Sequence, residues 1–89
     1  MIESQIVINN RLGMHARAAA RFVKLASVYA SNIELIKDGF STNGKSIMGI
    51  MMLAASQGTE LTLRVEGPDE MEAQMSLRKL VEDRFGEDE

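Results

Sequence analysis

The sequence has no cysteine and no tryptophan, and only one histidine and one proline among its 89 residues. Without cysteine the chain can form no disulfide framework, thiolate metal site or cysteine nucleophile, and a reducing cytoplasm fits this composition. One histidine without cysteine also excludes the usual zinc-ligand sets, so we expect no metal and no cofactor. The shortage of reactive side chains argues against most classes of enzyme.

Long apolar segments are absent too. The longest apolar run, Ile47 to Ala55, has nine residues, whereas a membrane-spanning helix needs roughly 18. The N-terminal residues lack the basic and apolar regions of a signal peptide, and a net charge of -3 argues against nucleic acid as a partner. We therefore expect a cytoplasmic protein. We also expect a monomer whose residues 1–89 form one domain.

Hydrophobic periodicity predicts secondary structure in the order βαββαβα. Strands are expected over residues 2–8, 33–36, 40–42 and 61–65, and helices over 16–28, over 47–55 and from 69 to at least 81. Such elements predict an α+β fold of two layers, with the helices on one face of a mainly antiparallel sheet. Asp69 and Glu72 have the spacing of a capping box, and Glu87-Asp88-Glu89 predicts a frayed acidic tail.

Charge is unevenly distributed along the chain. Residues 1–24 carry +3 and the remainder carries -6. This asymmetry has two interpretations, an ordinary solvated surface or a basic docking face around a reactive group.

The single histidine, His15, directly precedes the first predicted helix. Unpaired backbone amides and the helix dipole make this position an anion site, and imidazole can act as a nucleophile toward phosphorus. Arg17 is near enough for its fork of donors to reach phosphate oxygens. On spacing alone the simpler interpretation, a polar helix cap beside a solvated arginine, is favoured.

A second motif, Gly39 to Ser46, formally matches the phosphate-binding loop G-x-x-x-x-G-K-[ST]. A small nucleotide-binding module using this segment is an alternative from a different functional class. Against it, residues 40–42 predict a strand, and no later strand ends in the aspartate that such enzymes use for magnesium. Ser46 is expected to cap the following helix, and it is also a candidate phosphorylation target.

The predicted helix over 47–55 is apolar on all sides, although a helix in a two-layer domain buries only one. We expect a buried face of Ile50, Leu53 and Ala54. Ile47, Met48 and Met51 then face outward, as an adaptable partner surface or as extra core under a loop.

Two segments, Leu12-Gly13-Met14-His15-Ala16-Arg17-Ala18-Ala19 and Gly44-Lys45-Ser46-Ile47-Met48-Gly49, closely resemble the HPr family. These are the histidine-containing phosphocarriers of the bacterial phosphoenolpyruvate-dependent phosphotransferase system, and the similarity covers essentially the whole chain. The resemblance implies an open-faced β-sandwich of four antiparallel strands covered by three helices. It also implies that His15 takes a phosphoryl group on Nδ1 from phosphorylated enzyme I and passes it to an enzyme IIA domain, steadied by Arg17. Such a protein is a carrier rather than a free-standing enzyme.

The resemblance also assigns regulatory and docking residues. Ser46 matches the serine that HPr kinase/phosphorylase modifies. Ile47, Met48 and Met51 match positions that dock partners, and we expect the docking surface to consist of these three residues with Ala16, Arg17, Ala20 and Lys24. Ala18 stands where most members have proline, which is favoured in a first helical turn but is not required. Residues 12–14 resemble the nitrogen-related branch of the family and residues 44–49 the kinase-regulated carbohydrate branch, so both outputs stay open.

Overall fold

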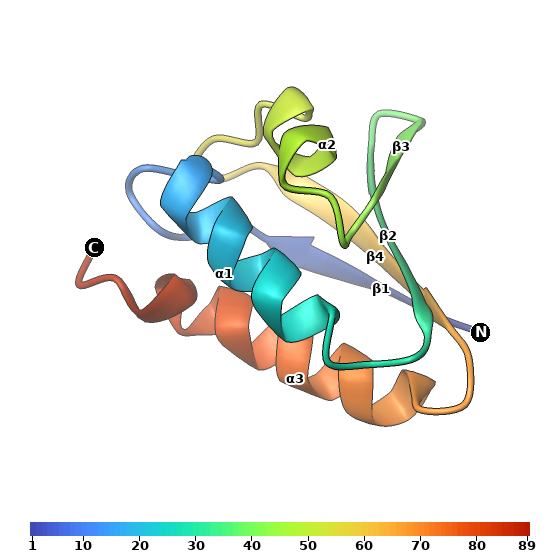
Figure 1. Cartoon of the computed structure of the whole chain (residues 1–89). Coiled ribbons are helices and arrows are strands. Elements are labelled where there is room, and N and C mark those ends of the chain that lie inside the picture. The colour runs from blue at the N-terminus through green and yellow to red at the C-terminus, as the bar shows by residue number, and fades with distance from the viewer.

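The computed structural model describes residues 1–89 as a four-stranded antiparallel sheet covered on one face by three helices (Figure 1). The elements are β1 (Ile2–Val7), α1 (Ala16–Ala26), β2 (Asn32–Lys37), β3 (Phe40–Asn43), α2 (Ile47–Met52), β4 (Glu60–Glu66), α3 (Glu70–Glu82) and a 3-10 turn, Arg84–Gly86. The predicted βαββαβα order and fold class are confirmed. None of the helices has both the length and the apolar character needed to cross a bilayer.

The sheet has the strand order β1-β4-β2-β3, with every neighbouring pair antiparallel. Val65 of β4 lies opposite Ile2 of β1 and Ile33 of β2, which sets the register of the three longer strands. Alternation then directs one set of side chains inward under the helices. The buried residues of this inner face are Ile6, Ile33, Leu35, Leu61, Leu63 and Val65.

Small residues let α1 pack closely against the neighbouring helices α2 and α3. Ala18, Ala19, Phe22 and Ala26 are buried along one side of α1, as the 3.6-residue period predicts. Because three of these four side chains are alanine, the helix can approach its neighbours closely while Phe22 fills the remaining space in the core. This packing fixes the N-terminal end of α1 beside the loop that follows β1.

The buried face predicted for residues 47–55 is only partly right. Ile50 and Leu53 are buried, but Ala54 is exposed and Ala55 takes the inner position. The helix ends at Met52, and Ala54 has a φ of +52°. This left-handed backbone conformation directs the Ala54 side chain to solvent and places the next residue, Ala55, in the core.

The predicted capping box at the start of α3 is wrong. Asp69 makes no side-chain bond to its own helix. Its carboxylate accepts hydrogen bonds from the Ser31 hydroxyl at 2.5 Å and from the backbone amides of Ala30 and Ser31 at 2.9 and 3.0 Å. These bonds, led by that from the Ser31 hydroxyl, lower the pKa of Asp69. Asp69 therefore ties α3 to the segment after α1.

We expect Gly13→Ala to destabilise the fold more than Gly39→Ala does. Both glycines have positive φ, +68° and +82°, so either alanine pays about 1–2 kcal/mol of backbone strain. A Cβ at position 13 would also lie 2.6 Å from the Ala55 carbonyl oxygen, whereas nothing lies within 4 Å of one at position 39. Overpacking adds about 1–3 kcal/mol at position 13. Urea denaturation of both variants measures the difference, and equal losses would contradict the steric argument.

Candidate functional site

The site is built around His15, the residue at the N-terminal end of α1. Its backbone is extended (φ -75°, ψ 177°), and its carbonyl oxygen accepts the amide of Ala19 at 2.8 Å. The imidazole makes no bond to the amides of the first helical turn. His15 is therefore not a side-chain cap, and the simpler interpretation of this residue is wrong.

The imidazole of His15 instead contacts the C-terminal segment. Its Nε2 atom lies 2.5 Å from Oε2 of Glu87, and 27% of the His15 side chain and 14% of the Glu87 side chain are exposed. Glu87 Oε1 accepts from Nδ2 of the buried Asn10 at 2.9 Å, and Glu89 pairs with Arg11 at 2.7 Å. The prediction of a frayed acidic tail is wrong, because these contacts attach the segment to the loop before α1.

The surroundings of Glu87 favour its charged form. Burial alone disfavours the carboxylate, but hydrogen bonds from Asn10 and His15, together with the charges of His15 and Arg21, outweigh it and lower the pKa of Glu87 below its ordinary value of 4.5. Glu87 is therefore an anion facing the ring of His15 at neutral pH.

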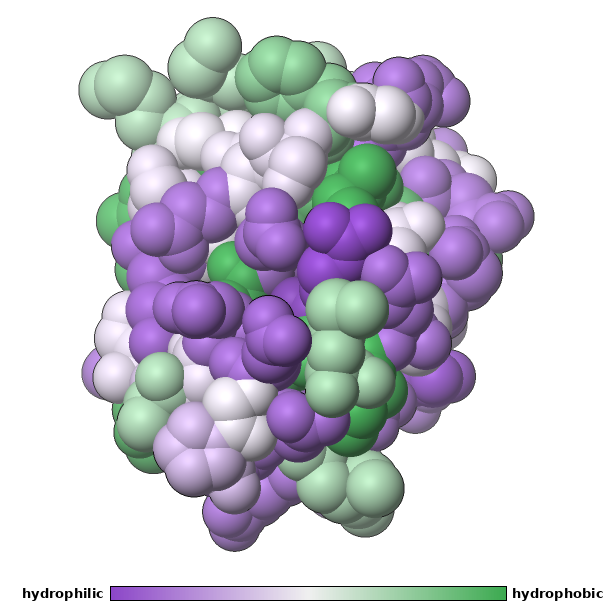
Figure 2. All heavy atoms as spheres, turned by 90° about the vertical axis from the view of Figure 1, so that its right-hand side faces the viewer, coloured by the Kyte–Doolittle hydropathy of each residue, from purple (hydrophilic) through white to green (hydrophobic).

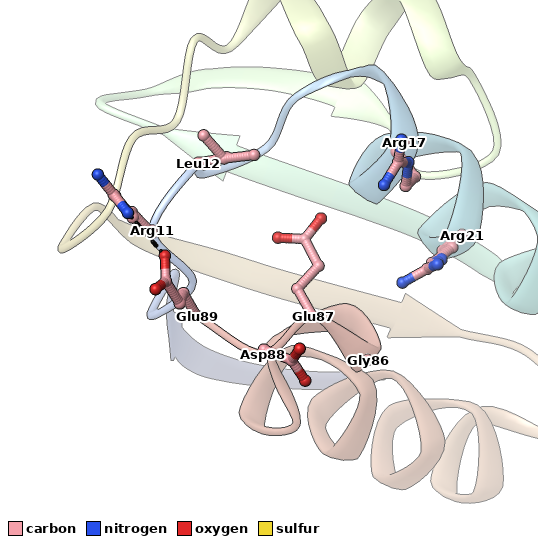
Figure 3. Close-up of a pocket in the computed structure, with 8 residues that line it drawn as sticks. All are labelled: Arg11, Leu12, Arg17, Arg21, Gly86, Glu87, Asp88 and Glu89. Carbon is pink, nitrogen blue, oxygen red and sulfur yellow. Dashed lines mark hydrogen bonds and ion pairs between the residues drawn. The ribbon is translucent and has the colours of Figure 1, made fainter.

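Arg17 lies two residues beyond His15, in the first turn of α1, with its side chain exposed and in no hydrogen bond or ion pair. It lines a groove of about 620 Å³ between α1 and the C-terminal segment. Figure 3 shows Arg17 and Arg21 on successive turns of α1, with Glu87 extending toward the loop before the helix. The other lining residues are Arg11, Leu12, Gly86, Asp88 and Glu89. One basic side chain that is free to bind an oxyanion, that of Arg17, thus opens onto this groove.

The basic residues of the first 24 positions are used in two ways. Arg11 pairs with Glu89, and the Arg21 guanidinium donates to the carbonyl oxygen of Phe85. Arg17 and Lys24 are exposed and have no ion pair. Part of the charge asymmetry is therefore internal pairing with the C-terminal segment, and part remains available to a partner.

The predicted docking residues lie on two neighbouring helices. Ala16, Ala20 and Lys24 are exposed along α1, and Ile47, Met48 and Met51 are exposed on α2, Met48 to 74%. The outward orientation expected for the α2 residues is confirmed. Met52, 69% exposed, was not anticipated and enlarges the same apolar surface. Figure 2 shows apolar side chains gathered along the top of the molecule, the end where Figure 1 places α2 and the β2–β3 turn.

Ser46 caps α2 as predicted, since its hydroxyl oxygen accepts the amide of Gly49 at 3.0 Å. Gly49 leaves room for this contact, because a Cβ there would lie 3.2 Å from Ser46 Oγ and would also meet Thr42 Oγ1 at 2.2 Å. Ser46 itself is partly exposed at the edge of the apolar α2 surface.

The segment Gly39–Ser46 is not a nucleotide-binding loop. Residues 40–43 form β3, paired with β2, and the amides that such a loop points at phosphates are already used. Those of Gly44, Lys45 and Ser46 donate to Ile33 O, Asn43 Oδ1 and Asn43 O at 2.7, 2.9 and 3.1 Å. The Lys45 ammonium donates to the Tyr29 carbonyl oxygen at 2.7 Å. The loop amides and the lysine that such a motif would direct at a phosphate are therefore bound within the fold.

Two residues of the site, Asn10 and Glu87, were not predicted. Asn10 is fully buried, and its amide nitrogen joins Gly13 O to Glu87 Oε1 at 2.8 and 2.9 Å. Neither residue lies in a motif, and 72 positions separate His15 from Glu87. Local periodicity carries no signal for such a pair.

Comparison with known proteins connects this geometry to one family. The family model described as "PTS HPr component phosphorylation site" matches residues 2–83. The chain is 48% identical to phosphocarrier protein HPr of Xylella fastidiosa over 88 residues, 99% of each chain. The crystal structure of HPr-C-His from Thermoanaerobacter tengcongensis is similar over the whole of both chains, with a TM-score of 0.96 and 49% identity. A crystal structure described as an HPr dimer from the same organism has a TM-score of 0.79 and 50% identity over 98% of this chain and 100% of that one.

Replacing Glu87 should lower the stability of the fold in a pH-dependent way. Because folding lowers the pKa of Glu87, its stabilising contribution is fully present above about pH 4.5, near the pKa of the unfolded chain, and is lost as the pH falls through the folded value. Glu87→Gln should therefore be less stable than the wild type at pH 6, with a difference that narrows toward pH 3. Urea denaturation over this range measures it, and a difference independent of pH would contradict the argument.

Proposed function

The chain belongs to the HPr family of phosphotransferase-system phosphocarriers, and from this premise we propose that His15 is the residue that accepts and donates the phosphoryl group. The observation that supports the proposal is a partly exposed imidazole at the amino end of an 11-residue helix, beside an unpaired arginine. The helix end favours negative charge. A phosphoryl group on His15 would gain from it, and no cofactor is needed.

Arg17 is the residue proposed to steady the phosphate. It is exposed at the groove and bound to no carboxylate, so binding a phosphoryl oxygen breaks no existing ion pair. Arginine presents donors in a planar fork that matches phosphate geometry. Positioning and charge stabilisation of this kind are most of what phosphoryl transfer requires.

The surface proposed to dock partners consists of the exposed residues of α1 and α2: Ala16, Arg17, Ala20, Lys24, Ile47, Met48 and Met51. It combines cationic and apolar side chains around His15, and flexible methionines adapt to differently shaped partners. We propose that phosphorylated enzyme I and enzyme IIA domains use it in turn, in the cytoplasm. Residues 1–89 would act as one domain, and a monomeric state stays a prediction.

Ser46 is the proposed site of regulation, by a kinase of the HPr kinase/phosphorylase type. Its hydroxyl is partly exposed and borders Ile47 and Met48. A phosphate there adds a charge of about -1.5 to -2 at pH 7 beside the docking surface. A partner whose negatively charged surface complements the cationic docking surface would be repelled by this phosphate and would bind more weakly.

The carbohydrate and nitrogen-related outputs use the same chemistry at His15. Transfer from phosphorylated protein to each candidate enzyme IIA separates them, since the cognate IIA is expected to accept the group fastest.

We expect incubation with phosphoenolpyruvate and enzyme I to add one acid-labile phosphate, and His15→Ala to abolish it. Arg17→Ala should accept phosphate about 10²-fold more slowly, as for loss of one charge-stabilising donor. Mass spectrometry of the intact protein and rapid-quench labelling measure the two effects. Label retained in His15→Ala would refute the assignment of the acceptor.

We expect Ser46→Asp to be phosphorylated by enzyme I at least about tenfold more slowly than the wild type, equivalent to about 1.4 kcal/mol. Ser46→Asn is the matched control, because it retains a capping side chain without the charge. Initial rates at several concentrations of the carrier locate the effect in binding or in transfer. Equal rates for Asp and Asn would contradict a charge-based mechanism.

A further inference from the structure

The C-terminal segment supplies a side chain to the proposed phosphoryl acceptor. Glu87 Oε2 lies 2.5 Å from Nε2 of His15. A carboxylate can only accept a hydrogen bond, so the proton of the neutral imidazole must lie on Nε2. The lone pair is then on Nδ1, which makes no bond to the amides of the first helical turn.

Glu87 is fixed from both sides. Its second oxygen, Oε1, accepts from the buried Asn10 at 2.9 Å. Phe85, two residues before it, is buried in the core, and the Glu89 carbonyl oxygen accepts the amide of Arg11 at 2.6 Å. A carboxylate held by a buried amide and an anchored backbone loses little entropy in binding the ring.

None of the other charged groups near the ring contacts the imidazole. Glu89 is paired with Arg11, and Arg21 is bound to the Phe85 carbonyl oxygen. The remaining charged groups at the groove are Arg17 and Asp88, and neither contacts the imidazole. Glu87 is therefore the one carboxylate in contact with His15. Arg17, drawn in Figure 3 on the first turn of α1, stays free for the phosphoryl group.

We propose that Glu87 is a positioning residue for phosphoryl transfer, which keeps the proton of His15 on Nε2 and stabilises the positive ring formed when Nδ1 is phosphorylated. The proposal rests on the proposed function of His15. The Nδ1 lone pair forms the bond to phosphorus as the bond to the donor protein breaks, and that electron pair leaves with the donor. Nε2 keeps its proton, so the ring becomes a cation that faces the Glu87 carboxylate.

Onward transfer reverses these changes. The bond between Nδ1 and phosphorus breaks, its electron pair returns to Nδ1, and the ring is again neutral with a proton on Nε2. No proton has to enter or leave in either direction. A carboxylate that stabilises the ring cation therefore serves both halves of the carrier cycle.

The test compares Glu87→Ala with the control Glu89→Ala. Each variant removes one carboxylate from the same segment, but only Glu87 contacts the ring. Phosphoimidazoles hydrolyse in acid through their ring-protonated form, so the pH dependence of dephosphorylation reports the charge beside the ring. We expect the pH profile of dephosphorylation to move about one pH unit lower in Glu87→Ala, because the ring cation loses a nearby negative charge that favours it. The profile of Glu89→Ala should match that of the wild type.

A second variant separates charge from hydrogen bonding. Glu87→Gln retains an oxygen acceptor, so nitrogen-15 NMR of the imidazole should still show the proton on Nε2, while the hydrolysis profile moves as for Glu87→Ala. We also expect acceptance of phosphate from enzyme I to slow about tenfold in both Glu87 variants. Identical profiles for Glu87→Ala and Glu89→Ala, or faster acceptance by Glu87→Ala, would overturn the proposal.

Failure of the proposed function would look different. In that case phosphate would remain in His15→Ala, whatever residue stands at position 87. If His15→Ala takes no label and the Glu87 variants behave as the wild type, the acceptor is correct and only the role of Glu87 is wrong.

Discussion

The buried amide of Asn10 joins the segments that meet at His15. Its nitrogen donates to Gly13 O in the loop that leads into α1 and to Glu87 Oε1 in the C-terminal segment. A buried donor that loses its partner costs about 1–3 kcal/mol, so both segments are held in place together. The loop sets the backbone position of His15, and the Glu87 carboxylate determines which nitrogen of the imidazole carries the proton. The geometry of the site thus depends on one amide that takes part in no chemistry itself.

That local arrangement relies on the packing beneath it. Three alanines and Phe22 bury one side of α1 in the core, and the helix presents its amino end beside the loop after β1. On the other side, Phe85 is buried in the same core and adopts a φ of +56°, which redirects the chain after α3 toward the loop. The core therefore brings the C-terminal segment and the loop before α1 to one place, as Figure 1 shows.

Sequence periodicity was sufficient for the elements whose stability is local or depends on one buried face. The alternation of Leu61, Leu63 and Val65 predicted β4, and Ser46 predicted the start of α2. Predictions failed where a side chain is satisfied by a distant partner. Asp69 has the spacing of a cap but binds the segment after α1. The acidic chain end has the composition of a disordered tail, but its Glu87 and Glu89 side chains bind His15 and Arg11. A short polar segment can be ordered by contacts 70 or more residues away, and no pattern within the segment records them.

The pairing of charged side chains determines which of them is free to bind the phosphate. Two carboxylates of the C-terminal segment bind groups of the basic loop: Glu87 binds His15 and Asn10, and Glu89 binds Arg11. Arg17 is the one basic residue lining the groove that has no partner, and it is also the basic residue nearest in sequence to His15. Had Glu87 paired with Arg17, an incoming phosphoryl group would first have to break an ion pair. Because the carboxylate contacts the ring instead, its negative charge acts on the nucleophile and the guanidinium of Arg17 stays free for the phosphate.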